Sequence, residues 1–187
     1  MYLESVEKFA QTAVDKSSFL KSSFSKYFLL SALAGIYIGF GMILIFSIGA
    51  PFAADASPAV KILMGASFGI ALSLVIFAGS ELFTGNNMTM VIGNLSGKVS
   101  IGDTATIWAV SWLGNLFGSL LIAFVMAKSG LISKDPWASF ISGISAAKMN
   151  APFLELFIRG VLCNMLVCLA VWTSARAKED TAKLILI

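Results

Sequence analysis

The sequence of 187 residues lacks histidine altogether, contains two cysteines, and has charged side chains at only 12% of its positions. Without histidine, the chain has neither the usual general base nor the commonest metal ligand. It also lacks a phosphate-binding loop and a dinucleotide-binding fingerprint. We therefore expect no enzyme activity, no catalytic residues, no metal site and no cofactor. The formal net charge of +3 is small and the basic residues are dispersed, so nucleic-acid binding is not indicated either.

The two cysteines, Cys163 and Cys168, lie five residues apart in one apolar segment. On a helix this spacing is a rotation of about 500°, so the two side chains point to different faces and cannot pair with each other. We expect both to be small apolar packing residues.

Long apolar runs accompany the scarcity of charge. Hydrophobic residues make up 58% of the chain and its mean hydropathy is +0.89, whereas roughly a quarter of the residues in an average soluble domain are charged. A helix of about 20 apolar residues crosses a bilayer core. The sequence therefore predicts an all-α polytopic membrane protein, with one membrane domain over residues 1–187. The predicted spans are residues 27–48, 59–92 with a break near 81–87, 104–127 and 152–175.

The remaining segments flank or connect these spans. Residues 1–26 carry apolar side chains at helical spacing with charges between them, which indicates an amphipathic helix on the membrane surface or against a neighbouring subunit. Residues 128–150 are polar and serine-rich and are expected to form a loop, with Trp137 and Phe140 as interfacial anchors. Residues 176–187 contain the beginning of another apolar segment, which we interpret as the start of a missing fifth helix.

The distribution of basic residues predicts the orientation of the chain. With the N-terminus in the cytoplasm, the inside segments carry eight basic residues and the outside segments carry four. Cytoplasmic loops are enriched in lysine and arginine, so this orientation is favoured over its inverse.

Three predicted spans carry glycines four residues apart, at Gly35–Gly39, Gly65–Gly69 and Gly114–Gly118. Small residues at this spacing let helix backbones approach closely in lipid. We interpret the repetition as a tight multi-helix bundle. The alternative is the general frequency of glycine in membrane helices.

A polar stretch, Glu81–Met88, interrupts the second span, and its Glu81 separates an uncharged run of 19 residues, 62–80, from one of 16 residues, 82–97. In hydrocarbon, backbone groups need partners, so irregular backbone is tolerated only inside protein or along a water-filled cavity. We expect Gly85 to supply a positive φ for the reversal. We expect Thr84, Asn86 and Asn87 to bond freed backbone groups or a passing polar solute along a pore. The alternative is a loop at the membrane surface.

Two apolar residues of the same stretch, Leu82 and Phe83, can form a constriction. A threonine beside such a constriction, here Thr84, fits a selectivity gate whose hydroxyl and amide donors face an anion.

Three further polar residues lie at or within the later spans. Lys148 precedes the last span and either attracts an anion to a vestibule or is an interfacial lysine that reaches to water. Asn164 and Asn115 lie inside spans, where an amide must find a partner in another helix or in water. A hydrogen bond to another helix is the favoured role for both.

The run Glu81-Leu-Phe-Thr-Gly-Asn86 resembles a motif of the formate/nitrite transporter family of bacterial anion channels. Three further features carry the same resemblance: Phe68 lies 14 residues before Leu82, Lys148 precedes the last span, and residues 159–172 are similar to the family's fourth-helix signature. The resemblance covers nearly the whole chain and looks closest to the hydrosulfide channel branch.

The resemblance implies a homopentamer with one pore per protomer and an aquaporin-like helical bundle of two inverted repeats, each with a broken helix. It implies that Phe68 and Leu82 line the constriction, that Lys148 attracts the anion and that Asn164 neighbours the central site. Gly85, Asn86 and Asn87 would belong to the polar pore loop beside Thr84. The second inverted repeat is incomplete here, so we expect the chain to be a fragment of a longer protein; the alternative is a truncated chain that does not function alone.

The function implied is a channel in the bacterial cytoplasmic (inner) membrane for small monovalent anions of weak acids, such as hydrosulfide, formate or nitrite. Protonation near the central site would let a neutral species cross the constriction, which avoids placing a bare charge in a low dielectric. Two alternatives remain open. One is an aquaporin-like pore for neutral solutes, whose Asn-Pro-Ala signature is absent from the sequence. The other is a membrane scaffold subunit that transports nothing.

Overall fold

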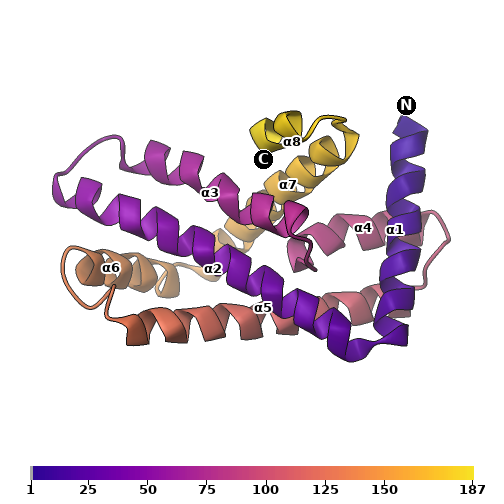
Figure 1. Ribbon diagram of the computed structural model, residues 1–187, viewed down its shortest axis with the longest axis horizontal. Helices are drawn as coiled ribbons and strands as arrows, with labels where there is room; N and C mark the ends of the chain where they lie inside the picture. The colour runs from indigo at the N-terminus through magenta and orange to yellow at the C-terminus, as the bar shows by residue number, and fades with distance from the viewer. Residues whose placement is uncertain (1) are drawn as a thin grey trace.

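The computed structural model describes residues 2–187, which fold entirely into α-helices and connecting segments, with no strand among them. Four of the helices, α2, α3, α5 and α7, are long and apolar enough to cross a membrane. The helices are α1 (Tyr2–Ser22), α2 (Phe24–Ala54), α3 (Val60–Phe77), α4 (Phe83–Leu95), α5 (Ile101–Ser129), α6 (Trp137–Met149), α7 (Phe153–Arg176) and α8 (Asp180–Leu186). In Figure 1, α2 runs between α3 and α5, and α1 crosses one end of this layer.

Close packing of α2 against α5 forms the centre of the molecule, and glycine makes it possible. A Cβ atom on Gly118 of α5 would overlap the carbonyl oxygen of Ala32, and one on Gly35 of α2 would overlap that of Asn115. The glycine patterns of these two helices therefore meet at one crossing, as the sequence suggested. The pattern in α3 does not take part, because a Cβ on Gly65 would meet no atom of residues 2–187 within 4 Å.

Helix α1 is amphipathic, and its apolar stripe faces the chain's own α4. Its buried residues are Phe9, Ala10, Ala13, Ser17 and Leu20. A Cβ on Gly93 of α4 would overlap that of Ala13, so glycine again permits the close approach. The sequence predicted that this helix lies on the membrane surface or against a neighbouring subunit. Neither prediction included the contact with α4.

The break between α3 and α4 differs from the predicted one in position and in its glycine. Non-helical backbone covers Ala78–Leu82, and the predicted break residues from Phe83 onward form the first turns of α4. Gly79 has the positive φ, +77°, so the prediction that Gly85 supplies it is wrong. Gly85 lies inside α4, where the backbone is helical and needs no left-handed residue.

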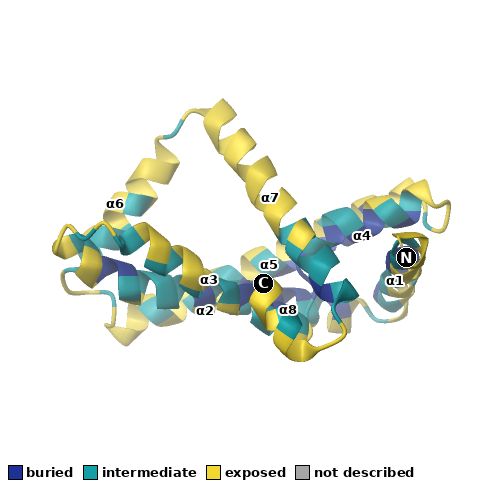
Figure 2. Cartoon of the chain, turned by 90° about the horizontal axis from the view of Figure 1, so that it is seen from above, coloured by how far each residue is buried: buried dark blue, intermediate teal, exposed yellow. Residues whose placement is uncertain are grey.

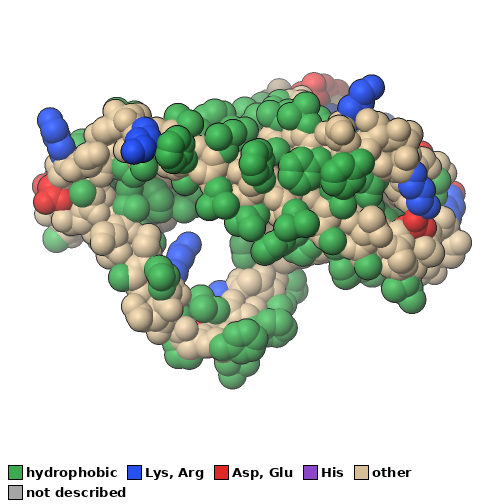
Figure 3. Space-filling model, turned by 90° about the horizontal axis from the view of Figure 1, so that it is seen from below, with side chains coloured by type: hydrophobic (Ala, Val, Ile, Leu, Met, Phe, Trp, Pro, Cys, Tyr) green, Lys and Arg blue, Asp and Glu red, His purple; other side chains and the backbone are tan. Residues whose placement is uncertain are grey.

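The predicted loop at residues 128–150 is also wrong, because Trp137–Met149 form α6. The turn before it begins at Gly130, which ends α5 with φ +75°. Serine and glycine within α6 weakened its helical signal. From α6 the chain enters α7, most of which is exposed on residues 2–187 and rises from the body as one limb of an arch (Figure 2). Figure 3 shows apolar side chains over much of the surface and an opening beneath this arch.

Replacing Gly118 by alanine is expected to destabilise the protein by about 1–3 kcal/mol, the usual cost of overpacking, because Ala32 presents rigid backbone to the new methyl group. The matched control is Gly65→Ala in the glycine pattern of α3, which adds a methyl group in open space. Thermal unfolding of the purified variants in detergent measures the difference. Equal losses of stability would contradict the assignment of the α2–α5 crossing as the central contact.

Candidate permeation site

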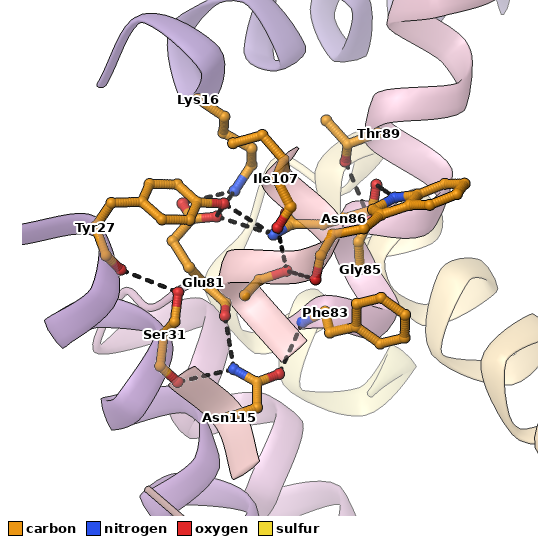
Figure 4. Close-up of polar contacts among 12 residues, drawn as sticks. Lys16, Tyr27, Ser31, Glu81, Phe83, Gly85, Asn86, Thr89, Ile107 and Asn115 are labelled. Atoms are coloured by element: carbon orange, nitrogen blue, oxygen red, sulfur yellow. Dashed lines mark hydrogen bonds and ion pairs between the residues drawn. The ribbon is translucent and has the colours of Figure 1, made fainter. Parts of the chain in front are cut away.

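The break is held from one side by the carboxylate of Glu81, which is buried at the junction of α1, α2 and α4 (Figure 4). Lys16 of α1 donates to both carboxylate oxygens, at 2.5 and 2.7 Å. The hydroxyl of Tyr27 donates to Oε2 at 2.9 Å, and Nδ2 of Asn86 donates to the same oxygen at 3.2 Å. An isolated buried charge is very costly, whereas this carboxylate has a cation and two neutral donors.

A second anchor, Asn115 of α5, satisfies the backbone of the break. Its Nδ2 donates to the carbonyl oxygens of Ser31 at 2.8 Å and Glu81 at 2.9 Å. Its Oδ1 accepts from the backbone N–H of Phe83 at 2.9 Å, so a side chain from another helix caps one of the free donors that begin α4. The break residue Glu81 also donates its own N–H to the carbonyl oxygen of Leu30 at 3.2 Å. The predicted role of Asn115, a hydrogen bond to another helix, is confirmed.

The other side of α4 carries a second polar cluster, shared with α7. Nδ2 of Asn87 donates to Oδ1 of Asn164 at 2.8 Å, and Nδ2 of Asn164 donates to Sγ of Cys168 at 3.2 Å. The thiol of Cys168 in turn donates to the carbonyl oxygen of Thr84 at 3.5 Å. We call Thr84, Asn87, Asn164 and Cys168 the amide–thiol cluster. It lies at the N-terminal end of α4, where helix backbone N–H groups carry partial positive charge.

Two adjacent asparagines thus face different neighbours of α4. Asn86 is 2% exposed and bonds Tyr27 and Glu81, so the structure places it in the buried anchor. Asn87 is half-buried and bonds Asn164. Of the predicted polar residues, Asn87 and Asn164 are therefore joined through their side chains, whereas Thr84 takes part through its main-chain carbonyl oxygen. Gly85 lies beside them, with its Cβ position 3.8 Å from Val171 of α7.

The predicted apolar residues lie in three different surroundings. Leu82 is buried in a hydrophobic cluster with Leu72 and Val75 of α3. Phe83 is half-buried at the start of α4. Phe68 of α3 is 37% exposed, and its ring lies 3.3 Å from the Cβ position of Gly41.

Lys148 lies apart from the cluster, exposed in the last turn of α6. Within residues 2–187, no hydrogen bond or ion pair joins it to the amide–thiol cluster.

Three residues of these clusters were not predicted from the sequence. Lys16 and Tyr27 carry no local pattern that points to Glu81, although Glu81 itself is the lone charge between two uncharged runs and as such needs a partner. Cys168 was expected to be a small apolar packing residue, and this is wrong, because its thiol both donates and accepts hydrogen bonds. Its spacing of four residues from Asn164, one helical turn, is the signal that places the two on one face.

Four helices long and apolar enough to cross a membrane define a multi-pass helical membrane protein. The break between α3 and α4 is anchored by buried polar groups, as irregular backbone at membrane depth requires. A family model described as formate/nitrite transporter matches residues 3–187. The chain belongs to the formate/nitrite transporter family, whose members are transporters and channels rather than enzymes.

Individual relatives agree with this assignment. The chain is 41% identical to the nitrite transporter NirC of Salmonella typhimurium over 189 aligned residues, which cover all of this chain and 68% of that protein. It is 37% identical to a probable formate transporter of Methanothermobacter thermautotrophicus, over 88% of this chain and 66% of that one.

Two solved structures share the fold. An FNT family ion channel superimposes with a TM-score of 0.91 at 39% identity, over 98% of this chain and 72% of that one. A pentameric formate channel with formate bound superimposes with a TM-score of 0.74 at 32% identity, over 89% of this chain and 66% of that one.

Substituting Lys16 by alanine is expected to destabilise the protein toward the lower end of the range of about 3–5 kcal/mol seen when one member of a buried ion pair is removed. The side chains of Lys16 and Glu81 are only 18% and 12% exposed, so the carboxylate would be left buried without its cation. Thermal unfolding in detergent measures the effect.

Lys21→Ala is the matched control, because Lys21 lies on the same helix and pairs with Asp103 but is itself 68% exposed. We expect it to change stability by no more than about 1 kcal/mol. The double variant Lys16→Met, Glu81→Gln should recover part of the loss, since it removes both charges. Similar losses for Lys16→Ala and Lys21→Ala would refute the anchoring role of Glu81.

Proposed function

We propose that the protein conducts small monovalent anions of weak acids across the bacterial cytoplasmic membrane. Family membership supports this, and the relatives' names point first to nitrite and formate. We include hydrosulfide because it has the same charge as nitrite and formate and a similar size.

The observation that carries the proposal is the amide–thiol cluster at the start of α4. Each amide nitrogen has two hydrogens and uses one within the cluster, so both asparagines retain an N–H group that can bind an anion. Asn87 lies near the N-terminal end of the half-helix α4, and Asn164 meets it there from the middle of α7. Transporters use the N-terminal ends of half-helices to face anionic groups. Uncharged donors bind an anion weakly enough to release it, as conduction requires.

The apolar residues would exclude the charged form. In the proposal, Phe68, Leu82 and Phe83 contribute a constriction next to the cluster, and Thr84 marks the transition from apolar to polar lining. Because a bare charge is costly among such residues, the permeating species would cross the constriction as the neutral acid.

Lys148 would raise the local concentration of anions at the entrance. Its side chain is exposed, so its charge can act on ions in solution over about a Debye length, roughly 8 Å at physiological salt. With the N-terminus in the cytoplasm, this entrance lies on the outer side of the membrane.

We further propose that the protein functions as a homopentamer with an aquaporin-like helix arrangement. A relative described as a pentameric formate channel supports this assembly. The extensive exposed apolar surface of α5 and α7 is suited to lipid or to neighbouring subunits.

Replacing Lys148 by alanine is expected to lower the initial rate of nitrite uptake into proteoliposomes by about tenfold at low ionic strength, the lower end of typical electrostatic steering effects. The difference should shrink at high salt because the lysine charge is screened. Lys134→Ala is the matched control, since Lys134 precedes α6 in the same connection between α5 and α7. Equal rates for the two variants would contradict the role of Lys148. Osmotic swelling with glycerol and no uptake of nitrite, formate or hydrosulfide would instead favour the pore for neutral solutes.

A further inference from the structure

The donor and acceptor of each hydrogen bond in the amide–thiol cluster are determined by one backbone carbonyl group. The carbonyl oxygen of Thr84 is main chain in helix α4 and can only accept hydrogen bonds. The thiol of Cys168, 3.5 Å away, must therefore be the donor in that contact. Its sulfur is then left as an acceptor, and it accepts from Nδ2 of Asn164 at 3.2 Å.

The orientation of both amides follows from this. With its NH2 group turned to the sulfur, Asn164 presents Oδ1 to α4, where Nδ2 of Asn87 donates to it at 2.8 Å. If the Asn164 amide were reversed, its oxygen would face the sulfur and its NH2 group would face that of Asn87. Two donors would then oppose each other, and the hydrogen bond between the helices would be lost.

The spacing on each helix makes this arrangement possible. Asn164 and Cys168 are four residues apart on α7, and Thr84 and Asn87 are three apart on α4, so each pair lies on one face of its helix. Cys163 is adjacent to Asn164 in sequence but is exposed and takes no part in the cluster.

We propose that Cys168 is a positioning residue for anion selection, which holds the amides of Asn164 and Asn87 with their remaining N–H groups available to the permeating anion. The inference rests on the proposed function, because those amides matter only if an anion passes them. Cys168 acts through Asn164 and need not touch the anion itself.

The test compares Cys168→Val, which keeps an apolar group of similar size but neither donates nor accepts, with Cys163→Val on the same helix. Uptake of nitrite into proteoliposomes is measured over a range of concentrations, with the protein expressed from its full coding sequence. Cys168→Val should raise the half-saturating nitrite concentration by about two- to tenfold, which corresponds to the loss of one hydrogen bond, while the maximal rate changes little. Cys163→Val should change neither quantity.

A second arm separates positioning from general packing. In an Asn164→Ala background, Cys168→Val should have no further effect on half-saturation, because residues that act as one unit are not additive. Cys168→Ala serves as a second variant if the valine protein does not fold. Additive effects of the two substitutions, or an active Cys168 variant with an unchanged half-saturating nitrite concentration, would refute the role of Cys168. Neither result would contradict the proposed function. Absence of uptake of every anion by the unmodified protein would overturn the proposed function, and the inference with it.

Discussion

The ion pair between Lys16 and Glu81 is the interaction on which the rest of the structure depends. A carboxylate in the middle of an apolar chain is tolerated only with a cation and further donors, and here the cation comes from a helix that lies 65 residues earlier in the sequence. The pair fixes α1 against the end of the α2–α5 layer and holds the break at one defined position. Asn115 completes the anchor by satisfying the backbone on both sides of Leu82.

The pairing of Glu81 with Lys16 also determines the electrostatic repulsion that an anion near α4 would meet. Two like charges about 4 Å apart at the effective dielectric of a protein surface repel by about 4 kcal/mol. An unpaired Glu81 would therefore oppose an anion at the start of α4. In the structure its charge is matched by Lys16, and Tyr27 and Asn86 donate further hydrogen bonds to it, whereas Asn87 bonds Asn164 instead. The face of α4 that meets α7 carries the uncharged amide of Asn87, which suits transient binding.

The sequence predicted those parts of the architecture that depend on neighbouring residues. The predictions failed where a feature depends on a residue far away in the chain. Apolar runs are sufficient for the membrane-crossing helices. Four-residue glycine spacing indicated the close approach of Gly35 and Gly118 to facing backbone, although the same spacing in α3 leaves Gly65 without such a contact. Gly79 and Gly85 could not be told apart from the sequence, because which of them adopts a positive φ depends on where α4 is capped. Asn115 of α5, 32 residues away from Phe83, decides that. Helix α6 was missed because serine and glycine are common in it, although they are also common in loops.

The sequence predicted which polar residues belong to the candidate site better than it predicted which residues they contact. Thr84, Asn86, Asn87 and Asn164 were selected because polar groups at membrane depth need a partner. Asn87 and Asn164 do bond each other, Thr84 takes part only through its main-chain carbonyl, and Asn86 bonds an internal carboxylate. A residue that appeared apolar, Cys168, links the meeting residues. Amides can donate or accept equally well, so their chemistry alone leaves the polarity of such a cluster undefined. A backbone carbonyl has no such freedom. Once the thiol bridges that carbonyl to Asn164, the helical backbone of α4 dictates which atoms of two side chains remain for an anion.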